Sequence, residues 1–198
     1  MKNVIIIAIA AIVFASCNNA DNKSAENKSA QPTSGEIDKK MAEVTSKNKD
    51  TTTLAVSITE ILSGYLKIKN AFTKDNDKDA AAAGNEMVKA FAAFNKAALT
   101  PDQAKIYNDV EDDAKEHAEH IGMNAGNIKH QREHFDMLSK DIYQLVKTFG
   151  GGQKLYYDHC PMYNDGKGAN WISESKEISN PYLGKPMPTC GTVKEELK

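Results

Sequence analysis

The fold of this chain is decided by residues 100–152, "TPDQAKIYNDVEDDAKEHAEHIGMNAGNIKHQREHFDMLSKDIYQLVKTFGGG". Thr100, Pro101 and Gln103 supply an N-cap, a proline at the first helical position and the partner residue of a capping box. Apolar residues then recur every three or four positions to about residue 121, and "GMNAGN" at 122–127 offers a turn. A second periodic run at about 127–148 stops at three glycines. The stretch predicts two antiparallel helices joined by a short turn.

Two further helices are predicted upstream, at about 53–72 and 78–98, and the polar segment "TKDNDKD" separates them. Both show apolar residues at the spacing of a core-facing helix surface. These residues are Ile58, Ile61, Leu62, Tyr65, Leu66 and Phe72 in the first helix and Met87, Val88, Phe91 and Phe94 in the second. Helices of this length with short links favour an all-α fold, and we expect an antiparallel four-helix bundle over residues 51–150.

Residues 151–198 have a different character, since prolines, glycines and aromatic residues dominate. "KLYYDHC" and "GANWIS" flank "NDGKG", which indicates a short β-hairpin. We expect a small, otherwise irregular C-terminal module of the same domain, packed on the bundle through aromatic side chains. The candidates are Tyr156, Tyr157, Trp171 and Tyr182.

The first residues are typical of an export signal. Lys2 precedes the apolar run "VIIIAIAAIVF", which is too short to remain in a bilayer as a spanning helix. The following "FASC" resembles the lipobox of bacterial lipoproteins, so we expect residues 1–16 to be removed and Cys17 to carry the lipid. The alternative is an ordinary signal peptide with a chance cysteine. Residues 17–50 are polar and poor in large apolar groups, which predicts a flexible tether.

Charge and motifs exclude several function classes. The chain has 25 basic and 27 acidic residues, and loss of the signal with Lys2 leaves 24 against 27, a net charge of −3. Arg132 is the single arginine and the sequence has no basic stripe, so nucleic acid is not an expected partner. No phosphate-binding glycine loop, nucleophile-elbow serine or zinc-protease motif is present. Cys160 beside His159 could suggest a thiol nucleophile, but adjacent side chains usually point apart, and we expect no enzyme.

Sulfur-bearing side chains gather in the C-terminal module. Cys-Pro-Met at 160–162 is nearly mirrored by Met-Pro-Thr-Cys at 187–190. Thiolates and thioethers are soft ligands that select copper(I), so the first candidate metal ligands are Cys160, Met162, Met187 and Cys190, with His159 next. A Cys160–Cys190 disulfide, with the methionines as packing groups, is the alternative in an oxidising compartment.

A second candidate metal cluster lies on the two helices of the deciding stretch. His117 and His120 are three positions apart and His130 and His134 four apart, so each pair shares a helix face. If the chain reverses near Ala125, His120 faces His130 and His117 approaches His134. Such imidazoles could bind copper or zinc, and the alternative is ordinary solvated histidines.

The C-terminal stretch "YYDHCPMYNDGKGANWISESKEISNPYLGKPMPTCGTVKEEL" resembles the end of the family catalogued as domain of unknown function 3347. "YLKIKNAF" and "HQREHFDMLSKDI" fit the same family, so the resemblance covers about residues 54–197. It implies a Bacteroidetes lipoprotein context, and the same domain also occurs fused to adaptor subunits of heavy-metal (copper/silver) efflux systems. The family has no established activity. His134 and Arg132 match its "QREHF" element; the alternative role of Arg132 is an ion pair with Asp113 or Glu116.

These observations together predict a lipid-anchored protein of the cell envelope, on the periplasmic or outer-membrane face. We expect it to bind a soft transition metal, copper above all, and either to buffer the ion or to pass it to a heavy-metal efflux adaptor protein. The alternative is a protein-interaction module whose tail is held by a disulfide.

Overall fold

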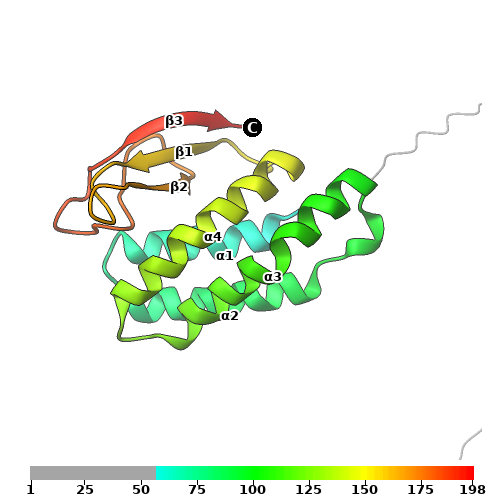
Figure 1. Cartoon of the computed structure of the whole chain (residues 1–198), viewed down its shortest axis with the longest axis horizontal. Coiled ribbons are helices and arrows are strands. Elements are labelled where there is room, and N and C mark those ends of the chain that lie inside the picture. The colour runs from blue at the N-terminus through cyan, green and yellow to red at the C-terminus, as the bar shows by residue number, and fades with distance from the viewer. Residues whose placement is uncertain (1–56) are drawn as a thin grey trace, which may run out of the picture. The chain divides into compact units, whose positions relative to one another are not determined.

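The computed structural model describes residues 57–198, in which four long helices pack beside a three-stranded antiparallel sheet (Figure 1). The predicted signal at 1–16, the tether at 17–50 and the lipid site at Cys17 lie outside the described residues. No helix within residues 57–198 combines the length and the apolar character needed to cross a membrane.

The helices begin and end where local sequence signals place them. They are α1 (Thr59–Phe72), α2 (Asp77–Ala93), α3 (Pro101–Met123) and α4 (Ile128–Phe149), with a short 3-10 helix η1 (Lys96–Ala98) after α2. Thr100 and Gln103 form the predicted capping box, and the Asn127 side chain accepts a hydrogen bond from the backbone N–H of His130. The second predicted helix is wrong at its end, because Phe94 is extended and the Asn95 side chain caps η1.

The apolar faces of the helices form one core. Ile61, Leu62 and Tyr65 of α1, with Met87 and Phe91 of α2, are all buried. Small residues let the helices approach closely, since a Cβ added to Gly84 would lie 2.7 Å from the Ala118 carbonyl oxygen of α3. α2 and α3 therefore pack backbone against backbone at this point.

A Gly84→Ala substitution is expected to destabilise the protein by about 1–2 kcal/mol, although alanine is the better helix former. The added methyl group must push α2 away from the α3 backbone, and that strain outweighs the gain in propensity. Thermal denaturation checks it, with the exposed Ala82→Gly as the control that isolates propensity. A Gly84→Ala protein more stable than the parent contradicts the close packing.

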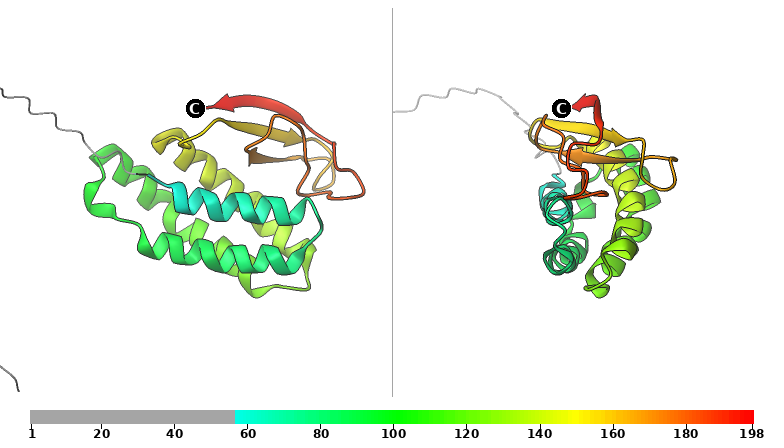
Figure 2. Two further views of the ribbon diagram at one scale, coloured as in Figure 1. Left: turned by 180° about the vertical axis from the view of Figure 1, so that it is seen from behind. Right: turned by 90° about the vertical axis from the view of Figure 1, so that its left-hand side faces the viewer.

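The C-terminal strands are β1 (Leu155–Cys160), β2 (Ala169–Ser173) and β3 (Thr192–Leu197), in the order β2-β1-β3. The β1–β2 pair is the predicted hairpin, whereas β3 was not predicted and the domain is mainly helical rather than all-α. The sequence pattern does not predict β3, because "TVKEEL" is a largely exposed edge strand in which apolar and polar residues do not alternate. The sheet lies against α1 and α4, with α2 on the far side of the helices (Figure 2).

Buried aromatic side chains join the sheet to the bundle. Tyr65 of α1 stacks on Phe135 of α4 at 5.0 Å between ring centroids. Its hydroxyl lies 2.8 Å from the Ser139 Oγ and accepts a hydrogen bond from the Ile172 N–H of β2. The Tyr182 hydroxyl donates to the Asn170 carbonyl oxygen and reaches the same serine. These contacts satisfy polar groups inside a shared core, so the C-terminal module and the bundle pack as one body.

The sequence suggested an ion pair of Arg132 with Asp113 or Glu116. The structure contradicts this suggestion, because Arg132 pairs with Asp75. Its guanidinium reaches away from α3 and donates to the Asp75 carboxylate, with an N–O distance of 2.6 Å. It also donates to the carbonyl oxygens of Phe72 and Pro181, at 2.8 and 2.7 Å. Arg132 thus ties the α1–α2 turn and the C-terminal module to α4.

Candidate metal centre

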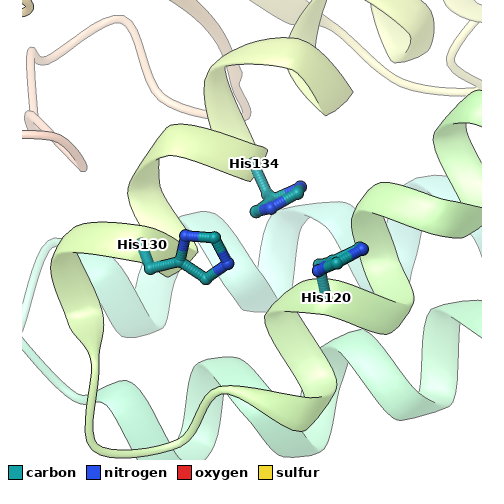
Figure 3. A group of neighbouring side chains, drawn as sticks. All are labelled: His120, His130 and His134. Carbon is teal, nitrogen blue, oxygen red and sulfur yellow. The ribbon is translucent and has the colours of Figure 1, made fainter.

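Three imidazoles meet between α3 and α4, close to the turn that joins them. His120 comes from the last turn of α3, and His130 and His134 from the first two turns of α4 (Figure 3). Their rings converge because the helices are antiparallel and the chain reverses at 124–127. One ligand nitrogen from each ring lies within 4.8 Å of the other two.

The ring geometry leaves room for an ion after small side-chain rotations. His120 and His134 stack at 4.2 Å between centroids, and His130 meets His134 at 4.6 Å. Nitrogens around a tetrahedral zinc-type ion at roughly 2.0 Å lie about 3.3 Å from one another. In the structure the nitrogens lie within 4.8 Å of one another, and χ rotation of the partly exposed His120 and His130 rings can bring them closer. Three imidazoles with one open coordination position suit copper or zinc.

His117 extends the cluster along the helix interface. Its Nδ1 lies 3.2 Å from the Nδ1 of His134, and the two rings are tilted at 53°. One of these two nitrogens therefore carries the hydrogen atom and donates a hydrogen bond to the other. His117 lies outside the group of three converging rings, so it is a candidate for orienting His134 rather than for direct ligation.

The local electrostatics keep the inner imidazoles neutral. Burial, followed by the neighbouring His120, His130 and His117, lowers the pKa of His134 to about 4. Burial also lowers the pKa of His117, against the opposing effect of Glu116 and Asp113. Neutral imidazole is the form that ligates a metal, so His134 is ready to bind an ion at neutral pH without first losing a proton.

Carboxylates flank the two remaining histidines. The Glu116 oxygen lies 3.7 Å from the Nε2 of His120, and the Glu133 oxygen lies 3.4 Å from the Nδ1 of His130. Carboxylates beside metal-binding imidazoles orient the rings and raise their basicity. From the sequence, Glu116 was named only as a possible partner of Arg132, and Glu133 was not named. Their spacings, four residues before His120 and three after His130, are the signal that could have linked them to the histidines.

The structure brings together only part of the predicted sulfur set. The Sγ atoms of Cys160 and Cys190 lie 3.2 Å apart, and both thiols are free. The side chains of Met162 and Met187 are exposed, at 55% and 38%. The Nδ1 of His159 lies 2.9 Å from the Asn170 Oδ1. A hydrogen bond with the Cys160 thiol raises the pKa of Cys190.

A pocket of about 590 Å³ opens elsewhere, between α1, α2 and η1. Its lining includes Ile58, Ile61, Ala90 and Phe94, and it contains none of the candidate metal ligands. The histidine cluster is therefore a surface site at a helix interface rather than a part of this pocket.

No curated protein and no solved structure matches the chain. Residues 61–154, which span most of α1 and all of α2, α3 and α4, match the model of a family described as "Protein of unknown function (DUF3347)". This match supports the assignment of the helical part of the chain, including all four clustered histidines, to the family that the sequence motifs resemble.

Proposed function

We propose that this chain binds a copper ion with the imidazoles of His120, His130 and His134, and that His117 orients His134. The observation that carries the proposal is the convergence of three ligand nitrogens within 4.8 Å of one another. Among divalent first-row ions, copper binds nitrogen ligands most tightly, and zinc binds the same ligands less tightly. We prefer the histidines to the predicted sulfur set, because both methionine side chains are exposed.

The wider role is copper handling at the cell envelope, with transfer to a heavy-metal efflux adaptor protein. The lipobox-like "FASC" and Cys17 support a lipid anchor, and the family resemblance supports the efflux context. A half-open site suits transfer, because an incoming ligand of the acceptor can take the open coordination position. The alternative, a protein-interaction module, has no comparable cluster of converging side chains in its favour within the part of the chain that the structure describes.

Titration with copper(II) and with zinc(II) against a competing chelator tests the site. We expect one-to-one binding that is tighter for copper, and weakening of about 100-fold or more in a His120→Asn, His134→Asn double variant. Loss of an outer-shell partner alone costs about 10–100-fold, so the loss of two ligands should exceed that. His159→Gln is the matched control, because His159 lies on β1 outside the cluster.

Electron paramagnetic resonance of the copper(II) complex gives an independent readout of ligation. Three bound imidazoles should produce nitrogen hyperfine structure that is simplified in the double variant and unchanged in His159→Gln. Equal copper affinity in the parent and the double variant would refute the site.

A further inference from the structure

We propose that Cys160 and Cys190 are a reversible dithiol–disulfide pair, in which Cys190 exchanges with external disulfides and Cys160 closes the ring. The inference is independent of the histidine site, which shares no residue with it. The chemical class of the partner is a disulfide, either of a small thiol or of a thiol oxidant protein.

The first support is the way the fold holds the two sulfur atoms. Cys160 ends β1 and pairs with Ala169, while Cys190 stands just before β3, whose Thr192 pairs with His159. The strands therefore bring together residues that are 30 positions apart, with 3.2 Å between the Sγ atoms. A disulfide bond is about 2.05 Å long, so closure requires a sulfur movement of about 1 Å.

The backbone around Cys190 is fixed by several contacts. The Cys190 carbonyl oxygen accepts a hydrogen bond from the Asn180 Nδ2 at 2.6 Å, and the Cys190 N–H donates to the Met187 carbonyl oxygen. Gly191 crosses so close to the Trp171 ring that an added Cβ would lie 2.8 Å from the indole. Because Asn180 is itself fully buried, Cys190 cannot drift away from Cys160 without breaking a buried hydrogen bond. The thiols are therefore held in reacting position.

The two thiols differ in accessibility, and this sets the order of reaction. Cys160 has no exposed surface, whereas Cys190 is partly exposed. An external disulfide RS–SR can therefore reach only Cys190. The hydrogen bond with Cys160 raises the pKa of Cys190, so only the small ionised fraction of this thiol reacts. That thiolate attacks one sulfur, forms a mixed disulfide Cys190–S–SR and releases RS⁻, which takes up the proton lost from Cys190.

The second step closes the ring. The Cys160 thiol loses its proton, and its sulfur attacks the Cys190 sulfur and expels the second thiolate, which leaves as RSH. The sum is one RS–SR and two protein thiols converted into one protein disulfide and two RSH, so that two electrons pass from the protein to RS–SR. The same steps in reverse reduce the pair. In an exported protein, as the sequence predicts, such oxidants are present.

Closure has a structural consequence. It links the end of β1 to the start of β3 and encloses β2 and the segments that carry Met162 and Met187. This part of the chain has few strands of its own, so a covalent link should restrict its unfolded state strongly. For a loop of this size we expect the melting temperature to rise by roughly 10 °C on oxidation.

The test uses the full chain with Cys17→Ser, so that Cys160 and Cys190 are the remaining thiols. The protein is equilibrated with reduced and oxidised glutathione at several ratios, alkylated and weighed by mass spectrometry. We expect one reversible transition between a doubly alkylated form and an unalkylated form that has lost two hydrogen atoms. The melting temperature should follow the same transition.

Two single variants test the order of reaction. Cys160→Ser should accumulate a glutathione mixed disulfide on Cys190, while Cys190→Ser should resist modification. Thiols that remain alkylatable at every glutathione ratio would overturn the proposal, as would faster mixed-disulfide formation at Cys160. Copper(I) retention by the reduced parent, with oxidation blocked, would also overturn it if a Cys160→Ser, Cys190→Ser double variant lost it and the His120→Asn, His134→Asn variant kept it. That result would return these sulfurs to metal binding. The glutathione titration is made on a protein that keeps both Cys160 and Cys190, so its result stands even if one of the single variants folds poorly.

Discussion

Replacing Asp158 with asparagine is expected to raise the thermal stability of the protein at pH 8 and to change it little at pH 5. Asp158 lies in β1, has no exposed surface, and neither of its carboxylate oxygens has a hydrogen-bond partner among the described residues. Trp171 lies directly opposite on β2, and its buried Nε1 also has no partner within residues 57–198. An ionised carboxylate in this place is unfavourable, whereas a neutral amide avoids the charge.

The direction of the pH dependence follows from the pKa. Burial raises the pKa of Asp158 from 3.8 to about 7, and the nearby Lys69 ammonium lowers it in part. Between these two values the folded protein keeps a proton that the unfolded chain has released. The free energy of unfolding therefore falls as the pH rises from about 4 to about 7, and above pH 7 the full penalty remains.

The size of the effect is set by the same difference. About three pKa units correspond to an upper limit of ~4 kcal/mol at pH 8, and more than half of this develops between pH 5 and pH 8. The new amide lacks partners and offsets about 1–2 kcal/mol at both pH values. Denaturant unfolding of the parent and of Asp158→Asn at pH 5, 6, 7 and 8 measures the growing difference.

Asp112→Asn is the matched control, since Asp112 is exposed on α3 and its charge needs no burial. Its effect on the free energy of unfolding should stay within about 0.5 kcal/mol and show no trend across the range. A parallel pH course for the parent and Asp158→Asn would show that Asp158 is ionised in the folded state at pH 5, contrary to its buried position.

Features that depend on residues close together along the chain were predicted best from the sequence. The capping box of Thr100 and the N-cap Asn127 are settled by residues within one helical turn, so the start of α3 and of α4 could be placed. The same locality explains the histidine cluster. Once two helices reverse over a short turn, positions at similar distances from the turn come together, as the 3.2 Å His117–His134 contact shows. The exact pairing differs from the prediction, because the His120 ring lies 4.2 Å from that of His134 and 6.1 Å from that of His130.

The features that the sequence missed depend on partners far along the chain. β3 is an edge strand whose only neighbour is β1, and its charged residues carry no strand pattern of their own. The predicted partners of Arg132 were wrong because helix-face reasoning considers α3 alone, whereas Asp75 lies in the α1–α2 turn. Asp158 also escaped notice, although it alternates with Tyr156 and Cys160 and so had to share their buried face. Metal binding at the histidines remains a prediction.

Replacing Arg132 with methionine is expected to lower the free energy of unfolding by about 3 kcal/mol, or the melting temperature by roughly 10 °C. Methionine keeps the apolar stem but removes every donor of the guanidinium. The Pro181 carbonyl oxygen then loses its donor, the Phe72 carbonyl oxygen keeps the Asp75 N–H, and the Asp75 carboxylate keeps the backbone N–H of Lys185. Groups left unpaired at a mostly buried site cost more than the ion pair itself contributes.

The backbone at Asp75 and Gly184 prevents other groups from replacing the hydrogen bonds that Arg132 donates. Asp75 has a φ of 54°, a left-handed conformation that is unfavourable for a residue with a side chain, and the bond from Arg132 helps to hold it there. Gly184 faces the same carboxylate so closely that no Cβ could fit, so the C-terminal module cannot move in to replace the missing donors. Burial raises the pKa of Asp75, but the hydrogen bonds from Arg132 and Lys185 outweigh it and lower the pKa overall. The stabilisation by Arg132 should therefore be complete at neutral pH and decline as Asp75 is protonated below about pH 4.

Thermal denaturation at pH 7 and at pH 3 measures both parts of this prediction. Lys105→Met is the matched control, because it removes an exposed ion pair with Asp109 on α3 and should change the free energy of unfolding by less than about 0.5 kcal/mol. If Arg132→Met destabilised the protein no more than Lys105→Met, the bonds of Arg132 would not be what joins α4 to the α1–α2 turn and the C-terminal module. A large loss that was the same at pH 3 as at pH 7 would assign the effect to the two carbonyl oxygens rather than to Asp75.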